Sequence, residues 1–191
     1  MGSYANQFLS PISYFKELKK VITMSYNNFP PALVTIKNRI FDPLGFVIRN
    51  LVTAPESSAY DGCSFEINGV GVVFRSAKIT PTKTGQFVTV WKRNEQGITQ
   101  PYKGSDNFDC MVIHVASGLH SGQLILPKTA LLTYGIIEGT KSGKRGFRVY
   151  PPWDATNNNQ AQKTQKWQLD YFVDTSETNV NLEKIKNLFG W

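Results

Sequence analysis

The sequence contains few of the residues from which metal and redox sites are usually built. Its 191 residues include only two cysteines and two histidines. Cys63 and Cys110 are 47 positions apart, and His114 and His120 are six apart, so neither pair has zinc-ligand spacing. We therefore expect no cofactor, and two buried, free thiols in a reducing cytoplasm.

Long apolar runs are also lacking. No run approaches the roughly 20 residues that cross a bilayer, and none resembles a signal peptide, so we expect no membrane insertion. With 41% hydrophobic residues the chain can still fill one core. The sequence predicts an N-terminal extension over residues 1–28, with one amphipathic turn, followed by a single domain over residues 29–191.

Acidic residues are outnumbered, 14 against 21 lysines and arginines, and the excess is local. Residues 70–148 hold 11 lysines and arginines but only four acidic residues, whereas both flanks are nearly neutral. No basic amphipathic helix accompanies this charge, so the clustering indicates a nucleic acid before a membrane. The alternative is a solvated basic face that has no partner.

The centre of the basic region reads as a β-hairpin. Polar and apolar residues alternate from Gln86 to Lys92, as in a strand with one buried face, although Phe87 is out of phase. Residues 80–85 contain the proline and glycine typical of a turn. The pattern predicts a long twisted hairpin over residues 74–93.

The remaining pattern predicts an α+β fold, in which a mainly antiparallel twisted sheet is flanked by helices. Residues 46–52 fit a helix or a strand, and residues 53–58 are expected to form a loop. Asn68-Gly69 is a strong hairpin-turn signal. Helices are predicted over residues 30–41, 127–134, 158–172 and 179–189. Further strands are predicted over residues 63–67, 70–78, 108–115, 123–127 and 147–150.

Four ordered blocks of the chain resemble the MepB-like family of small bacterial proteins. The blocks are residues 77–93, 126–128, 143–153 and 160–167. The resemblance extends over roughly residues 30–173. It implies a bacterial cytoplasmic α+β domain rather than a particular activity; the family is named for a member encoded beside a multidrug efflux pump.

These blocks coincide with the basic clusters, so we expect a nucleic-acid-binding face there. Its cations would neutralise phosphates, its amide would contact bases or phosphates, and its tryptophan would stack on an unpaired base. The candidate residues are Arg75, Lys78, Lys83, Gln86, Lys92, Arg93, Lys128, Lys144, Arg145, Arg148 and Trp153.

A metal-dependent nuclease is the enzymatic alternative. Glu56 and Asp109 would hold a divalent metal, and Lys78 or Lys128 would assist the attacking water. The acidic-x-Lys element of many nucleases is absent, because Ser76 stands two residues before Lys78 and Leu126 two residues before Lys128.

Other classes find less support in the sequence. Residues 139–145 miss the spacing and the hydroxyl of a nucleotide-binding loop, and no serine lies in a Gly-x-Ser-x-Gly element. A small-molecule binding protein linked to drug resistance stays as a third hypothesis. It predicts a concave pocket lined by Trp91, Trp153 and Trp167.

Overall fold

The computed structural model describes residues 29–176 and 180–191. The predicted N-terminal extension lies outside the described residues, as does Asn179, the predicted start of the last helix. The described chain is a mixed α/β fold built on a mainly antiparallel sheet, which confirms the predicted fold class. Among its helices, none has the length and apolar character needed to cross a bilayer.

The largest sheet has six strands, and its spatial order is β1-β2-β3-β8-β9-β11. The strands are β1 (Ile48–Thr53), β2 (Cys63–Ile67), β3 (Val70–Ser76), β8 (Cys110–Ser117), β9 (His120–Pro127) and β11 (Phe172–Asp174). Every neighbouring pair is antiparallel except β3 and β8, which run parallel. A parallel pair needs a crossover, and here the crossover contains four further strands.

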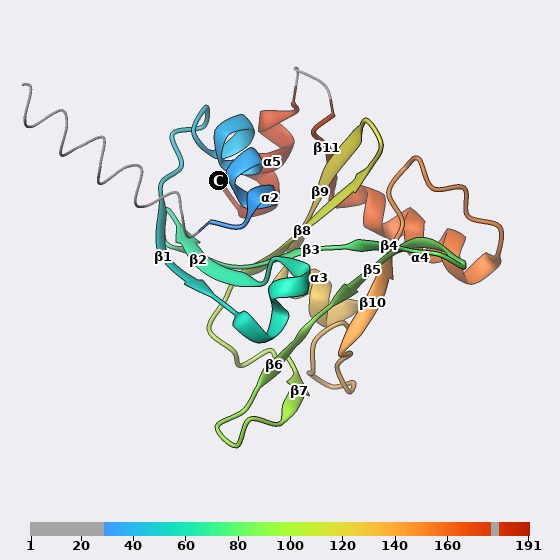
Figure 1. The fold of residues 1–191 in the computed structure, drawn as a ribbon, viewed down its shortest axis with the longest axis horizontal. Helices are drawn as coiled ribbons and strands as arrows, with labels where there is room; N and C mark the ends of the chain where they lie inside the picture. Colours follow the sequence, from blue (N-terminus) through green and yellow to red (C-terminus); the bar gives the residue numbers. More distant parts are fainter. Residues whose placement is uncertain (1–28, 177–179) are drawn as a thin grey trace, which may run out of the picture.

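Helices near the two ends of the described chain cover one face of this sheet (Figure 1). They are α2 (Pro31–Ile36), the π-helical turn η1 (Lys37–Phe41) and α5 (Leu182–Phe189). Pro31 is tolerated at the first helical position because its missing N–H would have no partner there. Leu33, Phe41 and Ile185 are at most 1% exposed and pack on the sheet in one apolar cluster.

The opposite face packs against a second layer. This layer contains a three-stranded sheet ordered β10 (Gly146–Val149), β5 (Lys83–Thr89) and β4 (Lys78–Thr80), with α3 (Lys128–Thr133) and α4 (Asn159–Asp170). Val88, Val149 and Met111 share its fully buried apolar cluster. A separate hairpin of β6 (Trp91–Arg93) and β7 (Thr99–Pro101) projects at the bottom of Figure 1.

The predicted central hairpin is present but shorter than expected. β3 ends at Ser76 and stays in the six-stranded sheet instead of continuing into the hairpin. The Ala77 N–H donates to the His114 carbonyl, which holds the chain beside β8. Only β4 pairs with β5 across the predicted turn. Two assignments were wrong: residues 55–60 form the 3₁₀-helix η2 (Pro55–Tyr60) rather than a loop, and Phe172 begins β11 rather than ending a helix.

Candidate nucleic-acid interface

The interface begins with the alternation of side chains along β5 and β6. Gln86, Val88 and Val90 are at most 1% exposed and point into the molecule. Since successive side chains of a strand point to opposite faces, Phe87 and Trp91 point outward, where both are half-buried. The out-of-phase position of Phe87 is therefore explained: it belongs to the outward face.

Strand pairing brings two cations beside Phe87. Lys78 of β4 and Arg148 of β10 lie directly opposite Phe87 on its two sides, and directly opposed residues share one face of a sheet. The ring of Tyr60 packs edge-on against Phe87, with centroids 6.4 Å apart, and the Lys78 ammonium lies 5.1 Å from the Tyr60 centroid. Rings and cations therefore alternate across this sheet.

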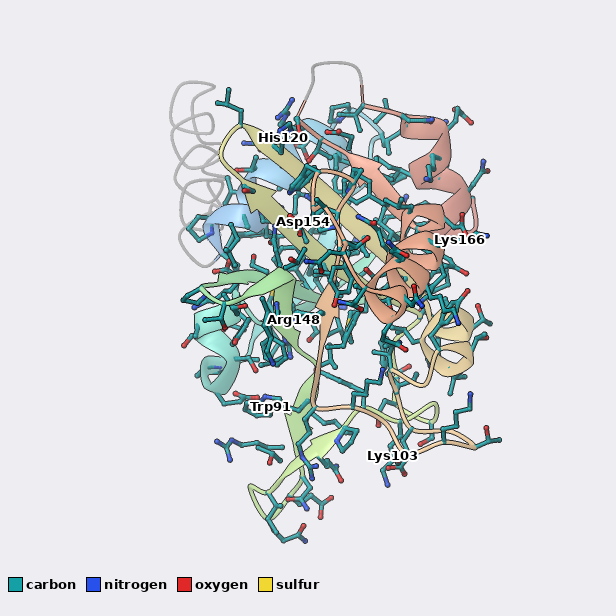
Figure 2. All side chains as sticks on the ribbon, turned by 90° about the vertical axis from the view of Figure 1, so that its right-hand side faces the viewer. Trp91, Lys103, His120, Arg148, Asp154 and Lys166 are labelled. Carbon is teal, nitrogen blue, oxygen red and sulfur yellow. The ribbon has the colours of Figure 1, made fainter. Side chains whose placement is uncertain are left out.

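Farther along the same run of strands, Arg93 and Trp91 extend the pattern. The Arg93 guanidinium lies 5.5 Å from the centre of the Trp91 ring. Arg145 reaches the neighbouring strand, where its Nη2 donates to the Thr99 carbonyl over 3.3 Å. Figure 2 shows Arg148 and Trp91 one above the other along these strands. We call this surface the basic strand face. It comprises Tyr60, Lys78, Lys83, Phe87, Trp91, Arg93 and Arg148, and we extend it to the exposed Lys144 and Arg145, which directly precede β10.

Arg148 also holds the β4–β5 hairpin in place. Its guanidinium donates to the Gly85 carbonyl over 2.9 Å and to the Thr80 hydroxyl over 2.7 Å. Gly85 has a φ of +82°, and an added Cβ would lie 2.6 Å from the Tyr150 ring, so this position requires glycine. Arg148 therefore contributes its charge from a fixed position.

The other cations of this face are exposed and make no ion pair within the described part of the chain. This group comprises Lys78, Lys83, Arg93, Lys144 and Arg145. None of the strands β4, β5, β6, β7 and β10 contains an acidic residue. A surface of this kind attracts anions, and its cations need not break existing ion pairs to bind them.

Five predicted site residues lie off this face. Arg75 and Gln86 are 2% and 1% exposed; Arg75 donates to the Phe74 carbonyl and the Tyr102 hydroxyl, and Gln86 to the Ala116 carbonyl. The remaining three residues are half-buried. Lys92 donates to the Asp106 carboxylate, and Lys128 donates to the Asp106 carbonyl. Trp153 stacks on His120 and packs against Phe172. Tyr60 and Phe87 are not among the predicted site residues, although the out-of-phase position of Phe87 was a signal.

The residues of the nuclease alternative do not assemble. Glu56 belongs to η2, and η2 lies near Arg75, at the end of β3. A Cβ added to Gly62 would contact both Ser57 of η2, at 2.5 Å, and the Arg75 guanidinium, at 3.3 Å. Asp109 accepts the Gly71 N–H over 2.8 Å, at the start of β3. Gly71 and Arg75 are separated by roughly 13 Å of strand. Across residues 29–176 and 180–191, no group of three acidic, histidine or cysteine side chains is arranged to hold a metal ion.

The histidine and thiol groups lack the features of reactive groups. The Nδ1 atom of His114 lies 2.9 Å from the side-chain nitrogen of Gln123, and burial lowers the pKa of His114. Burial raises the pKa of Cys63 to about 12 and also raises the pKa of Cys110, so both free thiols stay protonated at neutral pH.

The predicted tryptophan pocket is not formed. Trp167 stacks on Tyr134 with centroids 3.9 Å apart, whereas Trp153 contacts Phe172 and Trp91 lies on β6. Two hollows of the described chain, of about 550 and 280 Å³, have no tryptophan in their lining.

Comparison with known proteins shows the family to which the chain belongs. The model of the MepB-like family matches residues 54–174, and the chain belongs to that family. A crystal structure of MepB is 35% identical, with a TM-score of 0.65, over 68% of this chain and 88% of that chain. A structure of a bacterial homing endonuclease is 16% identical, with a TM-score of 0.40, over 72% of this chain and 86% of that chain. Among curated proteins, no sequence matches the chain.

Proposed function

We propose that this protein binds nucleic acid through the basic strand face. The observation that carries the proposal is a single surface with five exposed cations that make no ion pair within the described residues, interleaved with half-buried rings. Cations spaced along a strand would neutralise successive phosphates. The rings of Tyr60, Phe87 and Trp91 would stack on bases that are not paired, so a single strand uses both features.

We also propose that the protein acts in the bacterial cytoplasm. The two cysteines are free, which suits a reducing compartment. Membership of the MepB-like family, whose resemblance led us to expect a bacterial protein, supports the same location.

The proposal is tested by the salt dependence of binding. A labelled single-stranded oligonucleotide is titrated with the protein at 50 and 200 mM salt, and binding is followed by fluorescence anisotropy. Five neutralised phosphates give a slope of about −3.5 in log affinity against log salt, so the affinity should fall about one hundredfold. Absence of binding at 50 mM salt, or a slope near zero, contradicts the proposal.

A parallel titration with a double-stranded oligonucleotide and with magnesium separates the alternatives. We expect weaker binding of the duplex, because its bases are already stacked, and we expect the oligonucleotide to remain intact. Shortening of the oligonucleotide only when magnesium is present would replace the binding proposal with a nuclease.

A further inference from the structure

A hollow lined by Lys92 lies on the inner side of the strand run that carries the basic strand face. Its volume is about 550 Å³, and its floor is formed by β2 and β3 of the six-stranded sheet. Ser64 and Glu66 alternate with the buried Phe65 and Ile67, so they point away from α2 and α5 and into this hollow. A volume of this size is typical of small-molecule sites.

A glycine between two carboxylates opens the hollow. Gly71 lies directly opposite Glu66 on one side; on the other side its N–H donates to the Asp109 carboxylate and its carbonyl accepts the Asp109 N–H. Two strand spacings separate the backbones of Glu66 and Asp109, about 10 Å. A Cβ added to Gly71 would lie 3.2 Å from the Phe108 Cα and 3.5 Å from the Asp109 Oδ2, so a larger residue here would crowd the hollow at this row.

The charges of the hollow are opposite to those of the basic strand face. Three carboxylates line it, from Glu66, Asp106 and Asp109, against the single cation Lys92. Lys92 is bound by Asp106 in an ion pair. Glu66 accepts only the Asn50 amide and Asp109 only the Gly71 N–H, so within the described residues neither carboxylate has a cationic partner.

One wall of the hollow is aromatic. Tyr102 and Phe108 line it and pack edge to face, with ring centroids 5.5 Å apart. Aromatic rings attract cations through their faces, and they also offer apolar area to the body of a ligand. The wall therefore complements the two carboxylates rather than competing with them.

We infer that this hollow binds a small organic amine, with its ammonium group between Glu66 and Asp109 and its apolar body against Tyr102 and Phe108. An ammonium group donates three hydrogen bonds, whereas a single metal ion requires ligands within 2.0–2.6 Å. In the described part of the chain the acidic side chains are not arranged for such a metal ion. Nucleic acid is disfavoured here, because the unpaired carboxylates repel phosphates.

The inference is tested with three probes of similar size and different charge. They are 2-phenylethylamine, the neutral 2-phenylethanol and the anionic 3-phenylpropionate, each titrated into ¹⁵N-labelled protein and followed by amide chemical shifts. The amine should bind with a Kd of about 1 mM and shift the Gly71 amide, which donates to Asp109. The alcohol and the acid should bind at least about tenfold more weakly.

Matched variants locate the charge that matters. Glu66→Gln and Asp109→Asn keep one acceptor oxygen, replace the other with an NH₂ group and remove one charge each, and each should weaken amine binding about five- to tenfold. Glu183→Gln removes the same charge from α5, on the helical side of the sheet, and should leave binding unchanged. Equal binding of amine and alcohol, equal effects of all three variants, or no shift at Gly71 overturns the inference.

Discussion

The two sides of one strand run face different electrostatic surroundings, because successive side chains point to opposite sides. From Lys83 to Arg93, outward positions form the basic strand face, whereas Lys92 points inward to the acidic hollow and is paired with Asp106. On the outer side the cations have no acidic partner in the described chain, and on the inner side two carboxylates have none. Strand alternation therefore directs the outward cations to the surface and Lys92 to the hollow, whose unpaired carboxylates come from β2 and from the residue before β8.

The largest predicted effect comes from placing a charge on the wrong side of this run. Val88 is 0% exposed, so Val88→Asp should lower the free energy of unfolding by about 3–5 kcal/mol, because the buried carboxylate has no partner. Ile79→Asp on neighbouring β4 is the control. Ile79 is 62% exposed, and its replacement should cost less than about 1 kcal/mol. Urea denaturation measures both; similar losses would contradict the burial of Val88 on the inner side of β5.

An intermediate effect is expected from removing an outward ring. Trp91→Ala should weaken binding of a single-stranded oligonucleotide by about 1–3 kcal/mol, because one stacked base loses its platform. Duplex binding should change little, which anisotropy titrations of the two substrates would show. An equal loss for both substrates would mean that Trp91 acts by positioning Arg93, whose guanidinium lies over its ring.

A smaller effect is expected from removing the one cation that lines the hollow. Lys92→Met breaks the half-buried pair with Asp106 and should cost at most about 1 kcal/mol of stability. Amine binding should become about two- to threefold tighter, because a repulsive charge is lost. Weaker amine binding, measured by calorimetry, would place the ligand elsewhere.

The smallest effect is a pH dependence of stability that comes from His114, on β8 of the six-stranded sheet. Burial lowers the pKa of His114 and outweighs the opposing effects of Asp61 and Gln123. The unfolded chain therefore binds a proton more readily than the native protein, so stability should fall as the pH drops below about 6.5. His114→Gln should reduce this fall between pH 7 and 5 in urea denaturation. An unchanged pH profile would assign the fall to other groups.

Local patterns predicted the elements but not their partners. Asn68-Gly69 formed the expected hairpin turn with positive φ at both residues, because that turn is encoded by two adjacent residues. The parallel pairing of β3 and β8 is a contact between distant segments, and no local pattern reports it. The same reason explains β11, which is only three residues long and follows closely after α4. Its first residue was therefore predicted as part of the helix.

The candidate site was predicted only in part, because the sequence shows which side chains are charged but not which way each side chain points. Lys78, Lys83, Arg93, Lys144 and Arg145 are exposed as expected. Arg75 is equally basic, but it is buried beneath the second layer, where Tyr102 binds it. The hollow between Glu66 and Asp109 was not predicted, since it exists only where Gly71 separates residues that lie far apart in the sequence.

The most direct test of the central claim compares two charge reversals of equal size. Lys144→Glu/Arg145→Glu changes the basic strand face, and Lys163→Glu/Lys166→Glu changes two exposed residues of α4. Figure 2 shows Lys166 away from Arg148 and Trp91. At 50 mM salt we predict that the first pair weakens single-strand binding at least about tenfold more than the second. Equal losses would contradict a localised interface and leave only attraction by net charge.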